Sequence, residues 1–459
     1  MTKLKFYSGL KEIGGTVVAV ETDKAICLFD FGFSYADRLD SKVPLRKGME
    51  AYDYVRLGVL NAIDGIYEPE IAHKLDIKGC GETDKEIFVI ISHMHIDHMG
   101  GLGALDQRIP VYMSSQSATL YHELGVMGEL EIREHENVIP VDYDGSFTVG
   151  DITITCVQVD HDVIGACGFM IKTPDGSICY TGDYRYHGYH PEISAAFAQK
   201  CKGADVMISE GVTISHNDVD VLSLEGPYRD NNEYTLLDKM KEYASADSEF
   251  AGGLIVINNY NRNVERIHNF ARVIKETGRE LVLEPEQAEY VAAFYQEDEF
   301  SVYLPEGGSV DGLLIKNRRI VTRKDILANP SRFVLQQDYK HAYELFELAG
   351  VISVYLHMDG APLGDYDPSY AKFYELLSVA RINVVRCGLG GHAEPYYLRK
   401  QVDDIAPRTL IPLHSFRPEQ LLSRNVERIV LPNLNDTIEL VNGECFFENN
   451  AWCWCSNKR

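Results

Sequence analysis

The chain has 459 residues and carries 44 Lys and Arg against 69 Asp and Glu, a formal net charge of −25. This length is too great for one ordinary core and predicts two or three domains, while the negative charge disfavours polyanion binding unless a local basic patch supplies it. No apolar stretch approaches the ~20 residues of a membrane span, and the first residues lack the apolar core of a signal peptide. With ten scattered cysteines, these features predict a soluble, cytoplasmic protein with no membrane partner.

The chain opens with strand patterns. Residues 3–20 alternate between apolar and polar and then become continuously apolar, and a second strand at 25–29 ends at Asp30. Two strands joined by a polar turn predict a hairpin, and Asp30 is either a turn residue or a support for a site at the strand end. Helical stretches follow within 36–85, for example at 52–62, and are typical of packing or of a lid.

Four potential metal ligands follow the next strand, which we predict at 87–91. His93 and His95 are two residues apart, so in an extended loop both imidazoles can point to the same side, whereas Asp97 and His98 are adjacent and diverge. One pair can therefore bind one metal and the other pair a second. Imidazoles and a carboxylate suit zinc, manganese or iron, and two close ions can activate a water molecule between them.

The segments after this loop supply two further candidates at strand ends. A strand starting near residue 150 places His161 at its end, where the His93 and His95 pair lacks a third protein ligand. The hairpin predicted over 168–183 turns at Pro-Asp-Gly and leaves Asp183 at its exit. A carboxylate at that place could bridge two metals.

A third acidic candidate ends the apolar strand at 206–209. On the residues alone, Glu210 is equally well a helix cap or an active-site group.

From about residue 231 to residue 386, strands alternate with helices. A buried strand at 254–258 is followed by a helix at 264–277 and a strand at 280–283. This order predicts a parallel sheet of its own, inserted into the first domain. The segment 314–332 is conspicuously basic; such a run is usually a solvated face, and phosphate contact is the alternative.

The last part of the chain returns to strands that end in histidine. A strand at 383–386 leads into a glycine-rich turn before His392, and such turns can let backbone N–H groups approach a phosphate. A strand at 408–413 ends at His414, and two more strands are predicted at 428–431 and 437–440.

The metal loop carries a family resemblance. The motif His93-x-His95-x-Asp97-His98 with the two glycines that follow it resembles the signature loop of the metallo-β-lactamase superfamily. This implies an α/β protein with an αββα sandwich and two metals at the edge of its sheets. In that superfamily an Asp at the place of Asp30 supports the metal loop.

The match narrows to the β-CASP branch of the superfamily and, within it, to RNase J-like proteins. The resemblance rests on four ordered segments, namely residues 9–14, 260–279, 391–393 and 412–414. It implies a metallo-β-lactamase domain over 1–210, an inserted α/β β-CASP domain over 211–386, and a return to the first domain over 387–459.

The resemblance also assigns roles to residues. It implies two divalent metal ions, zinc in the first place with manganese or iron as alternatives. The first ion would be held by His93, His95 and His161 and the second by Asp97, His98 and His414, with Asp183 between them. The catalytic residues would be Asp97, Glu210 and His392, of which His392 contacts the scissile phosphate.

The implied activity is that of an RNase J-like ribonuclease, which hydrolyses phosphodiesters with a two-metal-activated hydroxide and leaves a 5′-phosphate. His414 favours single-stranded RNA as the partner, because DNA-repair members of the branch carry another residue there. RNase J-like proteins carry a His and a Ser in the loop where this chain has Gly388 and Gly390, so exonuclease and endonuclease action both stay open, as does oligomerisation. A nuclease of single-stranded DNA and a hydrolase of small phosphoesters are the alternative functions.

Overall fold

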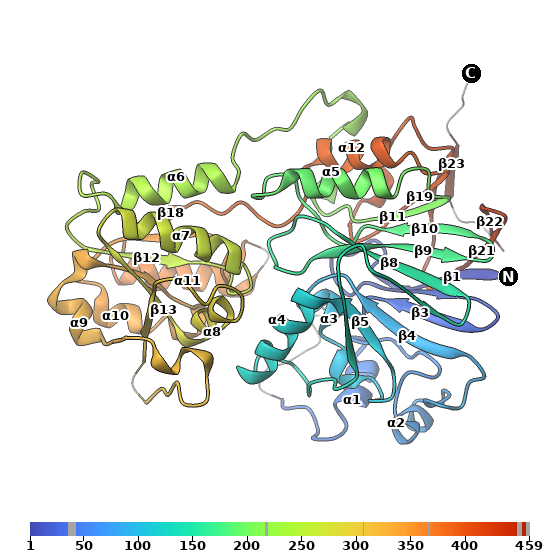
Figure 1. Cartoon of the computed structure of the whole chain (residues 1–459), viewed down its shortest axis with the longest axis horizontal. Helices are drawn as coiled ribbons and strands as arrows, with labels where there is room; N and C mark the ends of the chain where they lie inside the picture. The colour runs from blue at the N-terminus through green and yellow to red at the C-terminus, as the bar shows by residue number, and fades with distance from the viewer. Residues whose placement is uncertain (35–42, 216–218, 306, 366, 448–451, 456–459) are drawn as a thin grey trace. The chain divides into compact units, whose positions relative to one another are not determined.

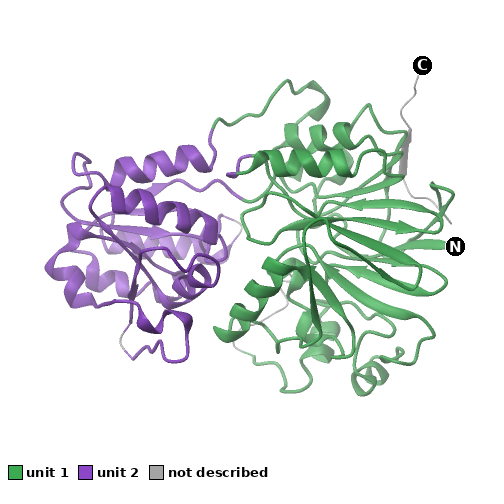
Figure 2. Ribbon diagram, in the orientation of Figure 1, with its two compact units in different colours: residues 1–186, 190–230, 391–459 green, residues 187–189, 231–390 purple. Residues whose placement is uncertain are grey.

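The computed structural model describes residues 1–34, 43–215, 219–305, 307–365, 367–447 and 452–455. The chain forms two compact units (Figure 2). Unit 1 consists of residues 1–186, 190–230 and 391–459, and unit 2 of residues 187–189 and 231–390. Unit 2 is thus an insertion in the chain of unit 1.

The boundaries of this insertion differ from the expected 211–386. Residues 211–230 belong to unit 1, because Ile214 and Val221 are buried in an apolar cluster with Leu398 and Val402 of helix α12 (Pro395–Ile405). At the other end, residues 387–390 belong to unit 2. The division therefore follows the packing of side chains, which the pattern of helices and strands did not reveal.

Unit 1 contains two eight-stranded sheets. The first has the order β22-β21-β1-β2-β3-β4-β5-β6, in which β3 to β6 are parallel and the other neighbours antiparallel. Its strands are β1 (Thr2–Ser8), β2 (Val17–Glu21), β3 (Ala25–Phe29), β4 (Glu86–Ile91), β5 (Val111–Ser114), β6 (Val138–Val141), β21 (Thr437–Val441) and β22 (Glu444–Phe447).

The second sheet has the order β23-β20-β19-β11-β10-β9-β8-β7, with a parallel centre from β10 to β20. Its strands are β7 (Ser146–Val149), β8 (Ile152–Gln158), β9 (Cys167–Thr173), β10 (Gly176–Tyr180), β11 (Val206–Ser209), β19 (Thr409–Pro412), β20 (Arg428–Leu431) and β23 (Trp452–Cys455). Parallel strands end at the same edge, so residues that follow β10, β11 and β19 are brought together.

The two sheets pack face to face, and helices cover their outer faces. Phe88 and Ile90 of β4 point into the core between the sheets, while Val89 and Ile91 are equally buried on the other face. Burial on both faces is what a parallel strand within a layered α/β protein requires. Figure 1 shows α5 (Pro191–Lys200) and α12 over the second sheet. The predicted αββα sandwich is confirmed.

The remaining helices of unit 1 lie around the first sheet and its metal loop. They are α1 (Glu50–Leu57), α2 (Pro69–Lys74), α3 (Ile96–Met99) and α4 (Ser115–Val126). The prediction of a helix over 52–62 was wrong at its end, because α1 stops where Gly58 adopts a left-handed conformation with φ of 73°. Residues 36–42 of the expected helical region lie outside the described part of the chain.

Unit 2 is built on a seven-stranded sheet of order β15-β14-β13-β16-β12-β17-β18, in which all neighbours are parallel. The predicted parallel sheet is therefore confirmed. Its strands are β12 (Leu254–Asn258), β13 (Glu280–Leu283), β14 (Ser301–Tyr303), β15 (Ile320–Val321), β16 (Phe333–Gln336), β17 (Ile352–His357) and β18 (Val384–Arg386). The helices are α6 (Glu233–Ala244), α7 (Val264–Glu276), α8 (Pro285–Phe294), α9 (Arg323–Ala328), α10 (Glu344–Leu348) and α11 (Pro368–Val379).

Among the helices described in either unit, none combines the length and the apolar character needed to cross a membrane.

Candidate metal centre

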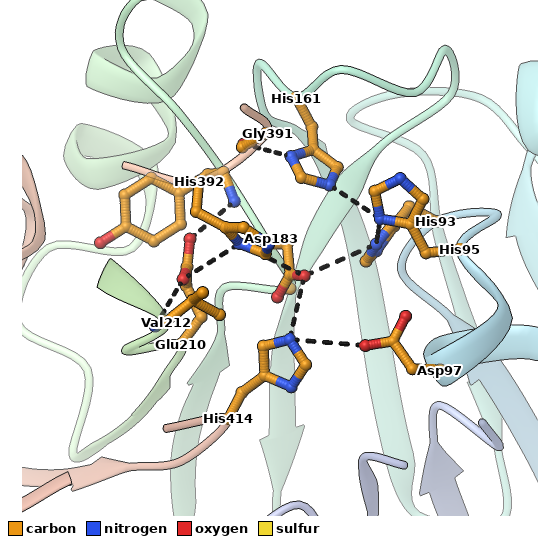
Figure 3. Close-up of polar contacts among 12 residues, drawn as sticks. His93, His95, Asp97, His161, Asp183, Glu210, Val212, Gly391, His392 and His414 are labelled. Atoms are coloured by element: carbon orange, nitrogen blue, oxygen red, sulfur yellow. Dashed lines mark hydrogen bonds and ion pairs between the residues drawn. The ribbon is translucent and has the colours of Figure 1, made fainter. Parts of the chain in front are cut away.

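The predicted site residues lie at the ends of strands of unit 1. His93 and His95 occupy the loop between β4 and α3, while Asp97 and His98 belong to α3 itself. His161, Asp183, Glu210 and His414 come shortly after β8, β10, β11 and β19. Figure 3 shows that the side chains it labels among these converge, with His392 among them. His98 joins them, because its Nε2 lies 3.2 Å from Asp183 and 3.6 Å from Asp97. The structure therefore brings together all nine predicted residues.

Four of these residues form a first ligand group. Nδ1 of His95 lies 3.0 Å from Nε2 of His93 and 3.3 Å from Nε2 of His161. Oδ2 of Asp183 is 3.7 Å from Nε2 of His93. The ligand atoms all lie within 4.8 Å of one another, which is close enough for one ion to contact them all. The first ligand group comprises His93, His95, His161 and Asp183.

A second ligand group lies on the other side of Asp183. It comprises Asp97, His98 and His414, whose ligand atoms also lie within 4.8 Å of one another. Nε2 of His98 is 3.2 Å and Nε2 of His414 is 3.4 Å from Oδ2 of Asp183. The same carboxylate oxygen thus faces both groups.

Asp30 fixes the metal loop from below. Its carboxylate accepts hydrogen bonds from the backbone N–H of Ser92 at 2.7 Å and from the Ser92 hydroxyl at 2.8 Å. Its Oδ2 is 2.7 Å from Nδ1 of His98 and also accepts from the hydroxyl of Tyr180. A ligand histidine whose other nitrogen is held by a carboxylate has its ring orientation and tautomer fixed. The supporting role expected for Asp30 is confirmed.

Several buried polar atoms at this site have no hydrogen-bond partner among the described residues. They include Nε2 of His98, Oδ2 of Asp183 and Nε2 of His414. Leaving such atoms unpaired in a buried place costs free energy, and native proteins rarely do so. A divalent cation bound to these atoms would satisfy them, so the residues present fit a metal site.

The histidines of the centre differ in the direction in which their pKa values are shifted. Burial lowers the pKa of His93 and of His161 and lowers the pKa of His95 to about 3, so these imidazoles are neutral at pH 7. Neutral imidazoles are the form that binds a metal.

His98 shows the opposite shift. Burial alone would lower the pKa of His98, but the carboxylates of Asp183, Asp97 and Asp30 outweigh it and hold that pKa well above its ordinary value. Despite burial, the pKa of Asp183 lies well below its ordinary value, because His414 and His98 face it. In the metal-free protein, His98 therefore holds a proton among these carboxylates. A bound metal ion would offset their negative charge instead.

His392 stands at the rim of the centre beside Glu210. Its Nδ1 is 3.3 Å from Oε2 of Glu210 and 3.7 Å from Oδ2 of Asp183. Burial lowers the pKa of His392, but Glu210 and Asp183 outweigh it and raise that pKa to about 9. The His392 side chain is 24% exposed and that of Glu210 only 1%, so a protonated imidazole backed by a buried carboxylate faces solvent.

Glu210 is held by backbone groups. Its Oε2 accepts a hydrogen bond from the N–H of Val212 at 3.1 Å (Figure 3). Its Oε1 accepts one from the N–H of Tyr184 at 3.3 Å. Of the two uses the sequence left open for Glu210, the structure favours a group of the centre, because Glu210 also faces His392.

Sequence reasoning missed Asp162. Its Oδ1 lies 3.4 Å from Nε2 of His95 and 3.4 Å from Nε2 of His161, and it is buried without a hydrogen-bond partner among the described residues. Since Nδ1 of His95 faces the first ligand group, Asp162 faces the opposite nitrogen of that ring. Its place directly after His161 was the only available signal.

Three arginines of the basic run at 314–332 form ion pairs with acidic residues. Arg319 and Arg332 both form ion pairs with Glu280, and Arg323 pairs with Glu344. For these three residues the solvated-face interpretation fits better than phosphate contact, because their guanidinium groups already have acidic partners.

Comparison with known proteins relates part of the chain to a protein family. A family model described as a beta-lactamase superfamily domain matches residues 72–226, which include the metal loop and all of the first ligand group. Over these residues the chain is similar to the metallo-β-lactamase superfamily. The crystal structure of a protein of unknown function from Enterococcus faecalis V583 is similar to it, with a TM-score of 0.80, 28% identity, and coverage of 95% of this chain and 99% of that chain.

Curated relatives of the chain bear the name ribonuclease J. The protein of Mycoplasma genitalium is 23% identical over 287 residues, which are 61% of this chain and 43% of that protein. The protein of Mycoplasma pneumoniae is 21% identical over 97% of this chain and 73% of its own length. The chain thus spans less than half the length of the first of these relatives.

Proposed function

We propose that this protein is a metal-dependent phosphodiester hydrolase that acts on nucleic acid, and that single-stranded RNA is its substrate. The observation that carries the proposal is the position of Asp183, whose Oδ2 faces both ligand groups. One carboxylate between two sets of ligands suits a pair of divalent ions that act together. The similarity to ribonuclease J proteins supports RNA as the polymer.

In this proposal the first ligand group holds one ion and the second ligand group, with Asp183, holds another. Imidazoles with few carboxylates favour zinc, and manganese or iron also fit the donor set. Bound ions of this kind lower the pKa of a water molecule and offset the negative charge that develops on phosphate oxygens.

The residues of the chain supply the remaining steps. His392, whose pKa Glu210 raises in the metal-free protein, donates a proton to the leaving 3′-oxygen of the substrate. Glu210 holds Nδ1 of His392 and so turns the other ring nitrogen outward. Asp30 keeps His98 in the tautomer whose Nε2 faces the centre. We also propose that unit 2 is the β-CASP insertion, whose role is to position the polymer.

The test is an incubation of the purified protein with 5′-labelled single-stranded RNA and with DNA of the same sequence. Zinc, manganese or a chelator is added, and the wild type is compared with the double variant Asp97→Ala/His98→Ala. The matched control is Asp106→Ala/His135→Ala, which also removes a buried Asp and a buried His of unit 1 but touches neither ligand group.

Metal-dependent cleavage of RNA that the ligand variant loses and the control keeps would support the proposal. Cleavage of DNA alone would replace RNA by DNA as the substrate. If neither polymer is cut while bis-p-nitrophenyl phosphate is turned over, the protein is a hydrolase of small phosphoesters.

A further inference from the structure

The glycine-rich loop that precedes His392 binds a carboxylate of its own unit. The loop, residues 388–390, follows strand β18, and Asp359 follows the neighbouring strand β17. The backbone N–H of Leu389 donates to Oδ2 of Asp359 at 3.0 Å, and that of Gly390 donates to Oδ1 at 3.0 Å. Two successive amides thus grip the two oxygens of one anion.

A buried arginine completes this anion site. Nη1 of Arg266 lies 2.8 Å from Oδ2 of Asp359, and its guanidinium also donates to Glu233 at 2.7 and 2.9 Å. Arg266 and Glu233 are fully buried, whereas the Asp359 side chain is 17% exposed. The site therefore opens to solvent at the carboxylate.

The chemistry of this site is that of a phosphate site. Consecutive backbone N–H groups that converge in a turn form a concavity that binds anions, and Gly390 supplies the positive φ of 76° that such a turn needs. A guanidinium beside these amides binds carboxylate and phosphate oxygens alike. Asp359 already occupies both backbone N–H groups and the guanidinium, so a phosphate group would have to displace it.

The absence of a side chain at Gly388 leaves space for the carboxylate of Asp359. A Cβ atom added to Gly388 would lie 2.4 Å from Oδ1 of Asp359, which is too close for both to stay. A side chain at position 388 and the bound carboxylate therefore exclude one another.

We propose that Asp359 determines specificity by occupying this anion site, so that the loop two residues before His392 does not hold the terminal phosphate of an RNA. This inference rests on the proposed function. It means that the substrate class is RNA irrespective of the chemical group at its 5′ end.

The experiment compares the metal-loaded wild type with two variants that empty the site in different ways. Asp359→Ala removes the carboxylate. Gly388→Ala pushes the carboxylate off the loop amides but leaves Asp359 in the chain as an ion-pair partner for Arg266. The second variant therefore still tests the inference if Asp359→Ala does not fold. The control is Asp367→Ala, which removes a carboxylate that accepts the backbone N–H of Ser369 but has no buried arginine behind it.

Two readouts are used. The first is the ratio of cleavage rates for one RNA sequence with a 5′-monophosphate or a 5′-hydroxyl. The second is the binding of inorganic phosphate by calorimetry, which needs no catalysis. For the wild type and for the control, we expect the two RNAs to be cleaved at equal rates. For both test variants, we expect a preference of about tenfold for the 5′-monophosphate, the effect of a few charge-assisted hydrogen bonds. Both test variants should also show an additional phosphate site.

The outcomes separate this inference from the proposed function. A wild type that prefers the 5′-monophosphate tenfold or more overturns the inference but leaves the nuclease intact. If no RNA is cleaved, the proposed function fails, and phosphate binding alone decides whether Asp359 fills an anion site. Test variants that bind phosphate no better than the control overturn the inference.

Discussion

Replacing Asp30 by Asn tests whether metal binding depends on the tautomer of His98. Asn accepts the left-handed backbone of position 30, where φ is 58°, because Asn tolerates that conformation. The substitution keeps the size of the side chain but exchanges one acceptor oxygen for an NH2 donor. Donors surround that carboxylate, namely Ser92 N, Ser92 Oγ, His98 Nδ1 and Tyr180 Oη.

One orientation of the side-chain amide in Asp30→Asn would change which nitrogen of His98 is free to bind a metal. If its NH2 faces His98, the ring must accept at Nδ1 and carry its proton on Nε2, the nitrogen that faces Asp183 at 3.2 Å. A protonated Nε2 cannot bind a metal. Loss of such a supporting partner typically lowers metal affinity 10–100-fold, about 1.4–2.8 kcal/mol.

The assay is a competition titration of zinc against a chromophoric chelator, with thermal unfolding of the metal-free protein as a second measurement. The control is Asp205→Asn, because Asp205 accepts hydrogen bonds from the N–H and hydroxyl of Ser177 as Asp30 does from Ser92, but faces no ligand. A zinc Kd of Asp30→Asn within threefold of the wild type would refute the tautomer argument.

Three further outcomes are expected. Gly32→Ala should lower the free energy of unfolding by about 3 kcal/mol or more in chemical denaturation, because the new Cβ would lie 1.7 Å from the carbonyl oxygen of Asp97; an unchanged midpoint would contradict this. Arg266→Met should cost about 3–5 kcal/mol in the same assay, since it leaves Glu233 and Asp359 without their buried cation; a gain in stability would show that the ion pairs are not needed. The metal-free protein should lose stability as the pH falls below about 6.5, because burial lowers the pKa of the three histidines of the first ligand group, so that the unfolded chain takes up their protons at a higher pH than the folded protein does. Each imidazole adds a slope of up to about 1.4 kcal/mol per pH unit, to be measured by urea titration at several pH values, and a flat profile would contradict the assignment.

Local patterns sufficed to predict most of the candidate site. One apolar strand is followed directly by four of the candidate residues, His93, His95, Asp97 and His98. The predicted ends of other strands also indicated His161, Asp183 and His414. A parallel arrangement brings such ends to one edge, so strand pattern and position together predicted convergence.

Other features depend on packing between distant segments. Asp162 is adjacent to a predicted ligand, yet its contact with His95 requires the loop after β8 to meet the loop after β4. Asp359 binds the loop amides of Leu389 and Gly390, some thirty residues later in the chain. Neither contact leaves a periodic trace in the sequence, which is also why the boundaries of unit 2 were misplaced.

The insertion of unit 2 imposes an order on how the two ligand groups arise during synthesis. Every member of the first ligand group has been synthesised once Asp183 has been made, whereas the second ligand group waits for His414, beyond the whole of unit 2. If the two groups hold two ions as proposed, a nascent chain can complete the ligands for one ion early and those for the other only after the insertion has been made. Occupancy of the second ligand group thus reports that the whole insertion has been synthesised, and a truncated chain would carry ligands for one ion but not for the pair.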